Sequence, residues 1–475
     1  MARVTVPPQP AMMTESSIRE PGSRRSAASV AGAGAFAVAL LVALAAPSTF
    51  GGHSTARAQG SAPNVLVVMT DDQPYGSQEK MPFISGRSDF VRFTQAFDNN
   101  PLCCPSRATF LSGLFSHHTG VETNDAADLF DPSRSIFTAF DDAGYETALI
   151  GKYLNRYPFG LGPTYRPPGF DRWVVFRGRV GYYDYALVED GTTVHYATDP
   201  SEYSTDVLAD HMQGFIEGAD EPFFALWTPY GPHGPYAAAP RHEDAFDGVP
   251  VDLPPNFNEV DENVHRFYSE QPSRRQSAIR EITRQQWAAL LSEDEAIERF
   301  FATLQDQGEL DNTIVAFTTD NGYSLGSHRW LEKQCLFDEC GHLPLMIKAP
   351  GIAGGAEDAV VSNVDLPTTL ADLAGVSFPQ TDGESLEPLL RDQATRLGRP
   401  VLLRGVRHSL GTKHPDFPPT AWGIRTRQWK YIRYRSGEVD MFNLTSDPFE
   451  RRDLADEARW AQQRRQLDSK LRDMK

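Results

Sequence analysis

Four short apolar runs, each followed at once by polar residues, constrain the fold of this chain most strongly. They cover residues 64–69, 147–150, 222–227 and 313–318. Continuous apolar runs rich in β-branched residues are typical of strands that are buried on both faces of a parallel sheet. Helix-like spacing separates the runs, at residues 137–144, 204–217 and 276–307. Strands that alternate with helices predict an α/β domain with a central sheet flanked by helices.

The pattern changes after Pro400. The segments at 422–425, 429–434 and 440–444 alternate like an antiparallel meander, and a charged helix closes the chain from about Asp456. We therefore predict two parts, a large α/β domain at residues 63–395 and a small C-terminal antiparallel subdomain with a closing helix at residues 400–475. A chain of 475 residues is long enough for both.

The first 58 residues look like an export signal. Arg24-Arg25 precedes an apolar run at 30–46, and residues 56–58 (Ala-Arg-Ala) offer a small-residue cleavage site. An uncleaved membrane anchor is the alternative, for which the run is barely long enough. Ser23-Arg24-Arg25 partly matches a twin-arginine signal. We expect an exported protein that is secreted, periplasmic or bound at the cell surface.

The net charge of −18 at pH 7 excludes one class of partner. An acidic surface repels nucleic acid, so we expect no nucleic-acid partner. A small anionic substrate is easier to reconcile with this charge than a long polyanion. The sequence does not indicate the oligomeric state.

A reactive side chain, a helix start and an arginine meet in the stretch 99–121. Cys103 heads the run Cys103-Cys104-Pro105-Ser106-Arg107. Proline favours the first turn of a helix, so we expect Cys103 just before a helix whose backbone N–H groups face any bound anion. Arg107, one turn along, would point at the same place. A nucleophile beside an anion site suits attack on a charged ester, although adjacent cysteines in an exported protein also form disulfides.

Carboxylates and an amide end two of the predicted strands. Asp71 and Asp72 follow the first run, and Asp320 and Asn321 follow the last. In open α/β sheets, ligands bind at the carboxyl ends of the strands. Carboxylate and amide oxygens are the ligands that Ca²⁺ takes in proteins. A polar turn is the alternative for the aspartate pair.

The other two runs end in groups that can carry positive charge. Lys152 repeats the strand-then-polar pattern, which would bring it into the same cleft, whereas a solvated lysine is the alternative. His233 lies between prolines and glycines on a stiff loop, which suits a positioned acid or donor. A surface histidine is the alternative there.

Cys335 and Cys340 remain if Cys103 reacts and Cys104 packs behind it. Four intervening residues in an exported protein favour a small-loop disulfide. Two free thiols are the alternative. Zinc binding would need a second Cys or His pair at suitable spacing, which the sequence lacks.

Six segments, taken in order, resemble the sulfatase family, which belongs to the alkaline-phosphatase-like superfamily. They are NVLVVMTDDQ, CCPSR with a following LSG, GKYLN, PHGP, TTDNG with a later lysine, and the tail IRTRQWKYIRY with MFNLTSDPFERRDL. They span about Pro63 to Leu454. The double cysteine, GKYLN, YYDYAL and residues 203–208 most resemble N-acetylglucosamine-6-sulfatases. The resemblance implies a mixed central sheet between helices, with residues 63–395 as the catalytic domain.

The resemblance also implies the chemistry of the site. Cys103 would be oxidised to formylglycine (3-oxoalanine) by a formylglycine-generating enzyme, and its hydrate would attack the sulfur of a small sulfated substrate, a sugar or aryl sulfate. One Ca²⁺ would be held by Asp71, Asp72, Asp320 and Asn321 and would also touch residue 103. Arg107 and Lys152 would stabilise the hydrate, and His233 and Lys333 would hold the sulfate and assist the leaving alcohol.

One position departs from the family pattern. Many arylsulfatases carry a histidine where this chain has Leu154, as the base that releases sulfate, so the base here could be Asn155 or His328. Two other functions stay open. One is a phosphonate or phosphate monoester hydrolase with the same nucleophile, and the other is a noncatalytic carbohydrate-binding protein on the same fold.

Overall fold

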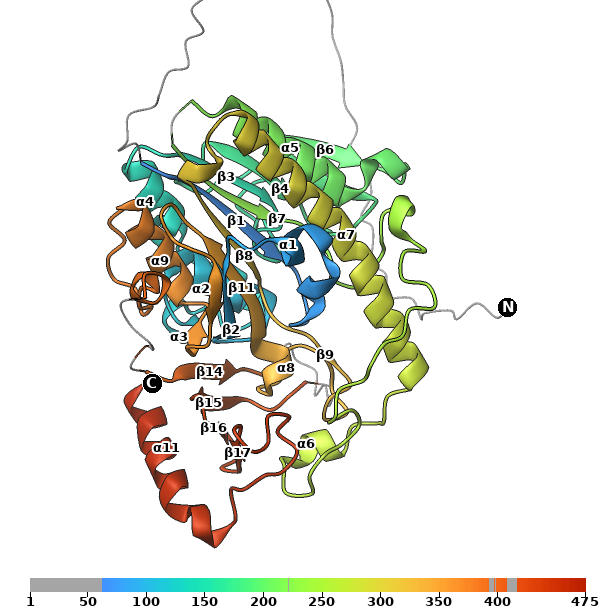
Figure 1. Cartoon of the computed structure of the whole chain (residues 1–475), viewed down its shortest axis with the longest axis vertical. Coiled ribbons are helices and arrows are strands. Elements are labelled where there is room, and N and C mark those ends of the chain that lie inside the picture. Colours follow the sequence, from blue (N-terminus) through green and yellow to red (C-terminus); the bar gives the residue numbers. More distant parts are fainter. Residues whose placement is uncertain (1–61, 221, 393–396, 398, 408–416) are drawn as a thin grey trace, which may run out of the picture. The chain divides into compact units, whose positions relative to one another are not determined.

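The computed structural model describes residues 62–475 apart from 221, 393–396, 398 and 408–416. The predicted export signal therefore lies outside the described residues. The described residues form one compact unit, which is drawn in Figure 1. No helix in the described ranges is both long and apolar enough to cross a membrane.

A mixed sheet of eleven strands forms the centre of this unit. β1 (Asn64–Thr70) lies between β7 (Phe223–Thr228) and β8 (Thr313–Thr319) and runs parallel to both. β3 (Glu146–Gly151) pairs with β7 in parallel, whereas β11 (His342–Lys348) runs antiparallel to β8. The four predicted strands and the mixed sheet are confirmed.

Six shorter or outer strands complete this sheet. They are β2 (Val91–Phe97), β4 (Arg172–Phe176), β5 (Tyr185–Glu189), β6 (Thr192–Tyr196), β12 (Gly355–Glu357) and β13 (Val361–Ser362). A hairpin turn at Asp190-Gly191 joins β5 and β6. The prediction missed β2, because polar side chains interrupt its apolar pattern. It also missed β4, because this strand is short and lies in a Gly- and Pro-rich region.

Helices cover both faces of the sheet (Figure 1). One layer contains α2 (Cys103–Ser112), α4 (Ile136–Asp142) and α9 (Asp365–Ala374), and the other contains α1 (Pro82–Gly86), α5 (Ser204–Gly218) and α7 (Gln276–Asp306). Four short helices lie in connecting segments: α3 (Ser116–Thr119), α6 (Arg266–Ser269), α8 (Asp338–Gly341) and α10 (Glu387–Leu390).

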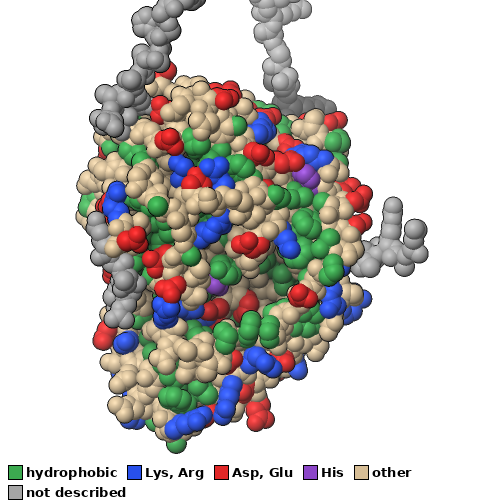
Figure 2. Space-filling model, viewed as in Figure 1, with side chains coloured by type: hydrophobic (Ala, Val, Ile, Leu, Met, Phe, Trp, Pro, Cys, Tyr) green, Lys and Arg blue, Asp and Glu red, His purple; other side chains and the backbone are tan. Residues whose placement is uncertain are grey.

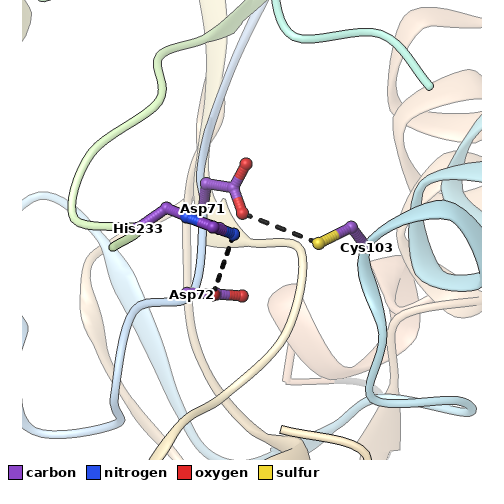
Figure 3. A group of neighbouring side chains, drawn as sticks. All are labelled: Asp71, Asp72, Cys103 and His233. Carbon is purple, nitrogen blue, oxygen red and sulfur yellow. Dashed lines mark hydrogen bonds and ion pairs between the residues drawn. The ribbon is translucent and has the colours of Figure 1, made fainter. Parts of the chain in front are cut away.

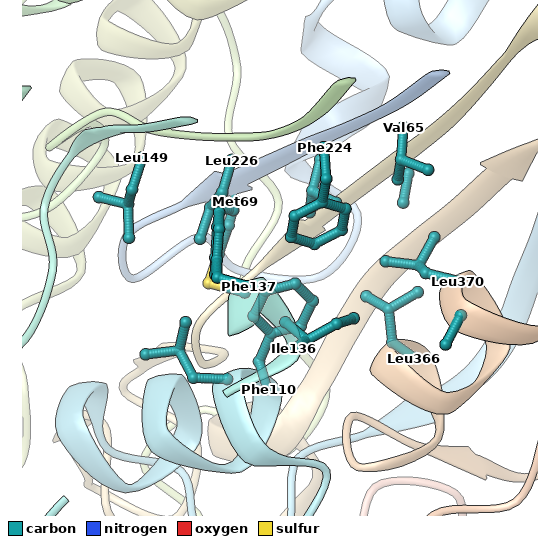
Figure 4. Close-up of a cluster of buried hydrophobic side chains, with 14 of the residues drawn as sticks. Val65, Met69, Phe110, Ile136, Phe137, Leu149, Phe224, Leu226, Leu366 and Leu370 are labelled. Carbon is teal, nitrogen blue, oxygen red and sulfur yellow. The ribbon is translucent and has the colours of Figure 1, made fainter. Parts of the chain in front are cut away.

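Packing on both faces explains the continuous apolar run of β1. Val65 and Met69 pack with the first helix layer, where they meet Phe110 and Phe137 (Figure 4). Leu66, the neighbour of Val65, packs with the second layer. Side chains of a strand alternate between its faces, and each full burial contributes about 1.5–3 kcal/mol, so both faces of β1 must be apolar.

The C-terminal part has its own antiparallel sheet, as predicted. Its strands are β14 (Val401–Gly405), β15 (Ala421–Arg425), β16 (Trp429–Tyr434) and β17 (Val439–Asn443), paired in that order. The closing helix α11 (Ala461–Asp473) begins later than the predicted Asp456. A short 3-10 turn at Ala458–Trp460 precedes it. The prediction missed β14, because this strand comes before the alternating segments at 422–444 that indicated the other three strands.

Candidate active site

The polar residues that end β1 and β8 are cross-linked to one another. Both strands are parallel neighbours, so their carboxyl ends meet at one edge of the sheet. The backbone N–H of Asp72 donates to Asp320 Oδ1 (3.1 Å), and Asn321 Nδ2 donates to Asp72 Oδ1 (2.7 Å). Asp72 has a φ of 62°, so the turn after β1 is held in a left-handed conformation that aspartate tolerates. The predicted acidic group is thus assembled in one place.

Cys103 faces this acidic group from the first turn of α2. Figure 3 shows its sulfur directed toward Asp71, and the distance from Sγ to Asp71 Oδ1 is 3.8 Å. Cys103 is the first residue of the helix, and Leu102 takes the N-cap position that was expected for the cysteine. The side chain is buried. Burial raises the pKa of the Cys103 thiol to about 12, so the unmodified sulfur is neutral and a poor nucleophile.

Arg107 and Lys152 bind the same carboxylates. Arg107 Nε donates to Asp320 Oδ2 (2.9 Å) and its Nη2 to Asp71 Oδ2 (3.3 Å). Lys152 follows β3 and pairs through Nζ with Asp71 Oδ2. Burial raises the pKa of Asp71, but the charges of Lys152, His233 and Arg107 outweigh burial and leave the pKa below its ordinary value. The carboxylate is therefore ionised at neutral pH.

Lys333 and His233 approach from the solvent side. Lys333 Nζ lies 2.5 Å from Asp72 Oδ1 and 2.9 Å from Cys103 Sγ. His233 Nε2 lies 3.4 Å from Asp72 Oδ2, while its Nδ1 lies 2.8 Å from the carbonyl oxygen of Gly234. His233 is 29% exposed, the most open of these side chains. Lys333 and His233 are therefore placed to meet an incoming anion.

The donor set fits a hard cation. One ligand atom each from Asp71, Asp72, Cys103 and His233 lies within 4.8 Å of the others. Asn321 Oδ1 is buried and has no hydrogen-bond partner in the described part of the chain. An amide oxygen left in that state costs free energy unless something else binds it. Together with the aspartates it offers the oxygen ligands that Ca²⁺ prefers.

The two candidate bases, His328 and Asn155, have different surroundings. His328 is buried, with its Nε2 3.1 Å from Asn256 Nδ2 and its ring stacked on Phe337. Asn155 donates its backbone N–H to Cys104 Sγ (3.0 Å). Among the described residues no hydrogen bond joins either side chain to Cys103, and the assignment of the base for sulfate release stays a prediction.

A covalent link holds the loop that carries Lys333. Cys335 and Cys340 form a disulfide. The backbone N–H of Gln334 donates to the carbonyl of Pro101 (2.9 Å), and Trp330 Nε1 donates to the carbonyl of Lys333 (2.8 Å). These contacts tie Lys333 to the segment that precedes Cys103.

Replacing both Cys335 and Cys340 by serine should lower stability more than turnover. Closing a loop this short contributes about 2 kcal/mol through the entropy of the unfolded chain. Thermal melting of the variant, and of the unchanged protein with and without reductant, checks this. An unchanged melting temperature would contradict it.

Sequence reasoning missed Glu293 on α7, which packs beneath the His233 loop. The carbonyl of Gly231 accepts the backbone N–H of Asp71 (3.0 Å). A Cβ placed on Gly231 would lie 2.0 Å from Glu293 Oε1. Glu293 is fully buried, and burial raises its pKa to about 8. A side chain at position 231 would therefore force the buried carboxyl group of Glu293 to move.

Gly231→Ala should reduce turnover by about 100-fold, because the added methyl group pushes the His233 loop away from Asp71. Adding Glu293→Ala removes the clash and should restore much of the activity. Steady-state kinetics of the single and double variants test this pair. If the double variant is no better than Gly231→Ala, the contact with Glu293 does not position the loop.

Fold and site together define a hydrolase of anionic esters, because buried cations and a helix start surround one cysteine beside a carboxylate cluster. Comparison with family models matches residues 63–376 to the sulfatase family. Residues 326–475 match the C-terminal region of N-sulphoglucosamine sulphohydrolase. The chain belongs to the sulfatase family and is a sulfuric ester hydrolase. The resemblance read from its motifs is confirmed.

Individual relatives agree with this assignment. N-acetylglucosamine-6-sulfatase of Capra hircus is 29% identical over 452 residues, which cover 84% of this chain and 81% of that protein. A solved structure in complex with its substrate D-glucosamine-2-N,6-O-disulfate is 26% identical, with a TM-score of 0.78 over 87% of this chain and 97% of that one. The phosphonate monoester hydrolase of Agrobacterium radiobacter is 21% identical, with a TM-score of 0.71 over 87% and 95%, and shares the fold.

Proposed function

We propose that this sulfatase removes a sulfate ester from a sugar unit, with residue 103 as formylglycine and with Ca²⁺ bound beside it. The surroundings of Cys103 carry the proposal, since its Sγ lies 2.9 Å from Lys333 Nζ and 3.8 Å from Asp71 Oδ1. A nucleophile held between a cation and a carboxylate cluster meets the needs of attack on an anionic ester. Similarity to N-acetylglucosamine-6-sulfatase supports a sugar as the alcohol.

Asp71, Asp72, Asp320 and Asn321 would hold the calcium ion. When bound, Ca²⁺ would supply positive charge that neutralises a sulfate oxygen. The buried side-chain oxygen of Asn321, which has no hydrogen-bond partner among the described residues, supports this set. Residue 103, as the hydrate, would supply a hydroxyl group for attack on sulfur.

The remaining residues of the site would bind the anionic groups and transfer a proton. Lys333 and His233 would bind the sulfate oxygens, and His233 or Lys333 would give a proton to the departing alcohol. Burial alone would lower the pKa of Lys152, but the charge of Asp71 outweighs burial and raises that pKa, so Lys152 stays cationic. Lys152 and Arg107 would thereby stabilise negative charge on residue 103.

A phosphonate or phosphate monoester hydrolase is the second candidate, because the Agrobacterium radiobacter enzyme of that class shares the fold. Turnover of nitrophenyl sulfate, nitrophenyl phosphate and a phenylphosphonate ester by the purified protein separates the two. We expect the sulfate to react fastest. A clear preference for either phosphorus ester would overturn the proposal.

Peptide mass spectrometry of residue 103 tests the nucleophile separately. We expect an aldehyde in protein produced together with a formylglycine-generating enzyme. An unmodified thiol in natively produced, active protein would contradict the proposed nucleophile. An unmodified thiol in inactive native protein would favour the noncatalytic carbohydrate-binding alternative.

We further propose that residues 1–58 direct export, with a twin-arginine route as one form of it. The Cys335–Cys340 disulfide supports this, because disulfides persist in oxidising compartments. Fractionation of producing cells tests it, and protein retained in the reducing cytoplasm would contradict it.

A further inference from the structure

A second cavity of about 660 Å³ lies between the main sheet and the C-terminal part. We call it the second cavity, and its lining includes Tyr75, Tyr323, Glu339, His342, Arg425 and Phe449. In Figure 2 the surface is hollowed near α8. The volume lies within the range of pockets that hold small ligands.

Two exposed aromatic rings meet at this cavity. Tyr75 and Phe449 are each 39% exposed. The other exposed large hydrophobic side chains in the described ranges are Leu129 and Leu161, which are not aromatic. Both exposed aromatic rings of this group therefore belong to residues that line the same cavity. Aromatic surface left in water at a concave site marks a place where a ligand gains free energy by covering it.

The ring of Tyr75 and the backbone of Phe449 are held in place without a ligand. The ring of Tyr75 stacks on His342 with 3.5 Å between centroids and 11° between planes, and His342 stacks in turn on Phe97. The carbonyl of Phe449 accepts a hydrogen bond from Asn256 Nδ2 (3.0 Å). A flat surface fixed in advance loses little conformational entropy on binding.

Polar groups with unused hydrogen-bonding capacity form the other wall. Arg425 is buried, donates from Nη2 to Gln95 Oε1 (2.6 Å) and pairs with Asp338 (3.2 Å). Its Nε, and Oε2 of Glu339, are buried and lack a hydrogen-bond partner in the described chain. One donor and one acceptor beside an aromatic surface match hydroxyl groups, which both donate and accept.

The charges of the second cavity argue against a sulfate. Three carboxylates, of Asp338, Glu339 and Asp358, face two guanidinium groups, of Arg425 and Arg427. Each guanidinium is already paired with a carboxylate. Because the described residues of the cavity offer no unpaired positive charge, binding there would not offset the free energy that an anion loses when it leaves water. An uncharged ligand with hydroxyl groups and an apolar face fits these walls better.

The second cavity and the active site share a wall. Tyr323 follows the metal-site residue Asn321 by two positions and lines the cavity, and its hydroxyl lies 2.7 Å from that of Tyr236. Tyr236 lies on the His233 loop, where its backbone N–H donates to the carbonyl of His233 (3.1 Å). Tyr75 follows Asp72 by three positions. One ligand that spans several sugar units could therefore reach both places.

We propose that the second cavity binds an unsulfated sugar unit of the saccharide chain whose sulfated unit is hydrolysed at Cys103. The proposal rests on the proposed function for the identity of the chain. It assigns Tyr75 and Phe449 as the surface on which the apolar face of the sugar ring stacks, with Arg425 and Glu339 binding its hydroxyl groups.

Binding of unsulfated N-acetylglucosamine and its trimer to the full chain tests the proposal, by saturation-transfer NMR and calorimetry. We expect the trimer to bind, and Tyr75→Ala and Phe449→Ala each to weaken it by about tenfold or more, the loss expected for one aromatic contact. Leu161→Ala, which removes an exposed side chain away from the cavity, should leave binding unchanged. Tyr75→Phe keeps the stacked ring and should retain binding even if Tyr75→Ala fails to fold.

Turnover of nitrophenyl sulfate separates this proposal from the proposed function. It should change less than about twofold in the Tyr75 and Phe449 variants, because neither side chain touches the site at Cys103. Absence of trimer binding, or trimer binding that survives both alanine variants, would overturn the second cavity as a sugar site. Displacement of the trimer by a small sulfate ester would place it in the active site and would overturn it too. Failure of the proposed function would appear instead as no hydrolysis of nitrophenyl sulfate.

Discussion

Cys103→Ala is expected to lower turnover of a sulfate ester by at least about 10⁴-fold, which is the scale of losing a nucleophile. The proposed oxidation turns Cβ of Cys103 into the aldehyde carbon with loss of the sulfur, and alanine lacks the thiol that this oxidation requires. Alanine fits the space of the cysteine at the start of α2, so circular dichroism and thermal melting should show a folded protein. Steady-state kinetics with nitrophenyl sulfate measures the effect.

Cys104→Ala is the matched control. Its sulfur is also buried, but it accepts a hydrogen bond from the backbone of Asn155, and Cys104 packs in the hydrophobic core of the first helix layer. We expect that variant to lose some stability and to keep most of its activity. Substantial turnover by Cys103→Ala would show that residue 103 is not the nucleophile.

Asp320→Asn is expected to weaken Ca²⁺ binding by at least about 100-fold and to lower turnover at least as much, because one of the proposed negative ligands is lost. The change keeps the shape of the side chain. It also weakens the pair between Arg107 and Asp320, which now joins their Nε and Oδ2 atoms at 2.9 Å. Calorimetric titration with Ca²⁺ and metal analysis of the purified variant measure the loss.

Asp294→Asn controls for removal of a buried carboxylate. Asp294 accepts hydrogen bonds from the backbone of Phe83 and Ile84 at the start of α1. Its replacement should cost stability while Ca²⁺ binding stays as it was. Wild-type Ca²⁺ affinity in Asp320→Asn would remove Asp320 from the metal ligands.

Residues that follow buried strands were the easiest part of the site to predict. Asp71, Lys152 and Asp320 follow apolar runs within two residues, and His233 lies on the loop after β7. Parallel strands bring such ends to one edge of the sheet. The local sequence therefore indicated both the strand and the polar site residue that follows it. The helix that carries Cys103 was likewise marked by Pro105.

Contacts between distant segments could not be predicted. Glu293 lies in the middle of α7, where a charged residue in an amphipathic helix looks solvent-exposed, yet it is buried against Gly231. His328 looked available as a base, but it is packed against Phe337. Such placements depend on how layers pack, and no local pattern encodes them.

Burial of Cys103 limits when the proposed oxidation of its thiol can take place. The residue is 1% exposed, and Lys333, which lies 230 positions further along the chain, covers its sulfur. A modifying enzyme must hold the thiol in its own active site, which the closed structure does not permit. We therefore expect oxidation to precede the pairing of β1 with β8. A chain that folds before it is oxidised would stay permanently inert.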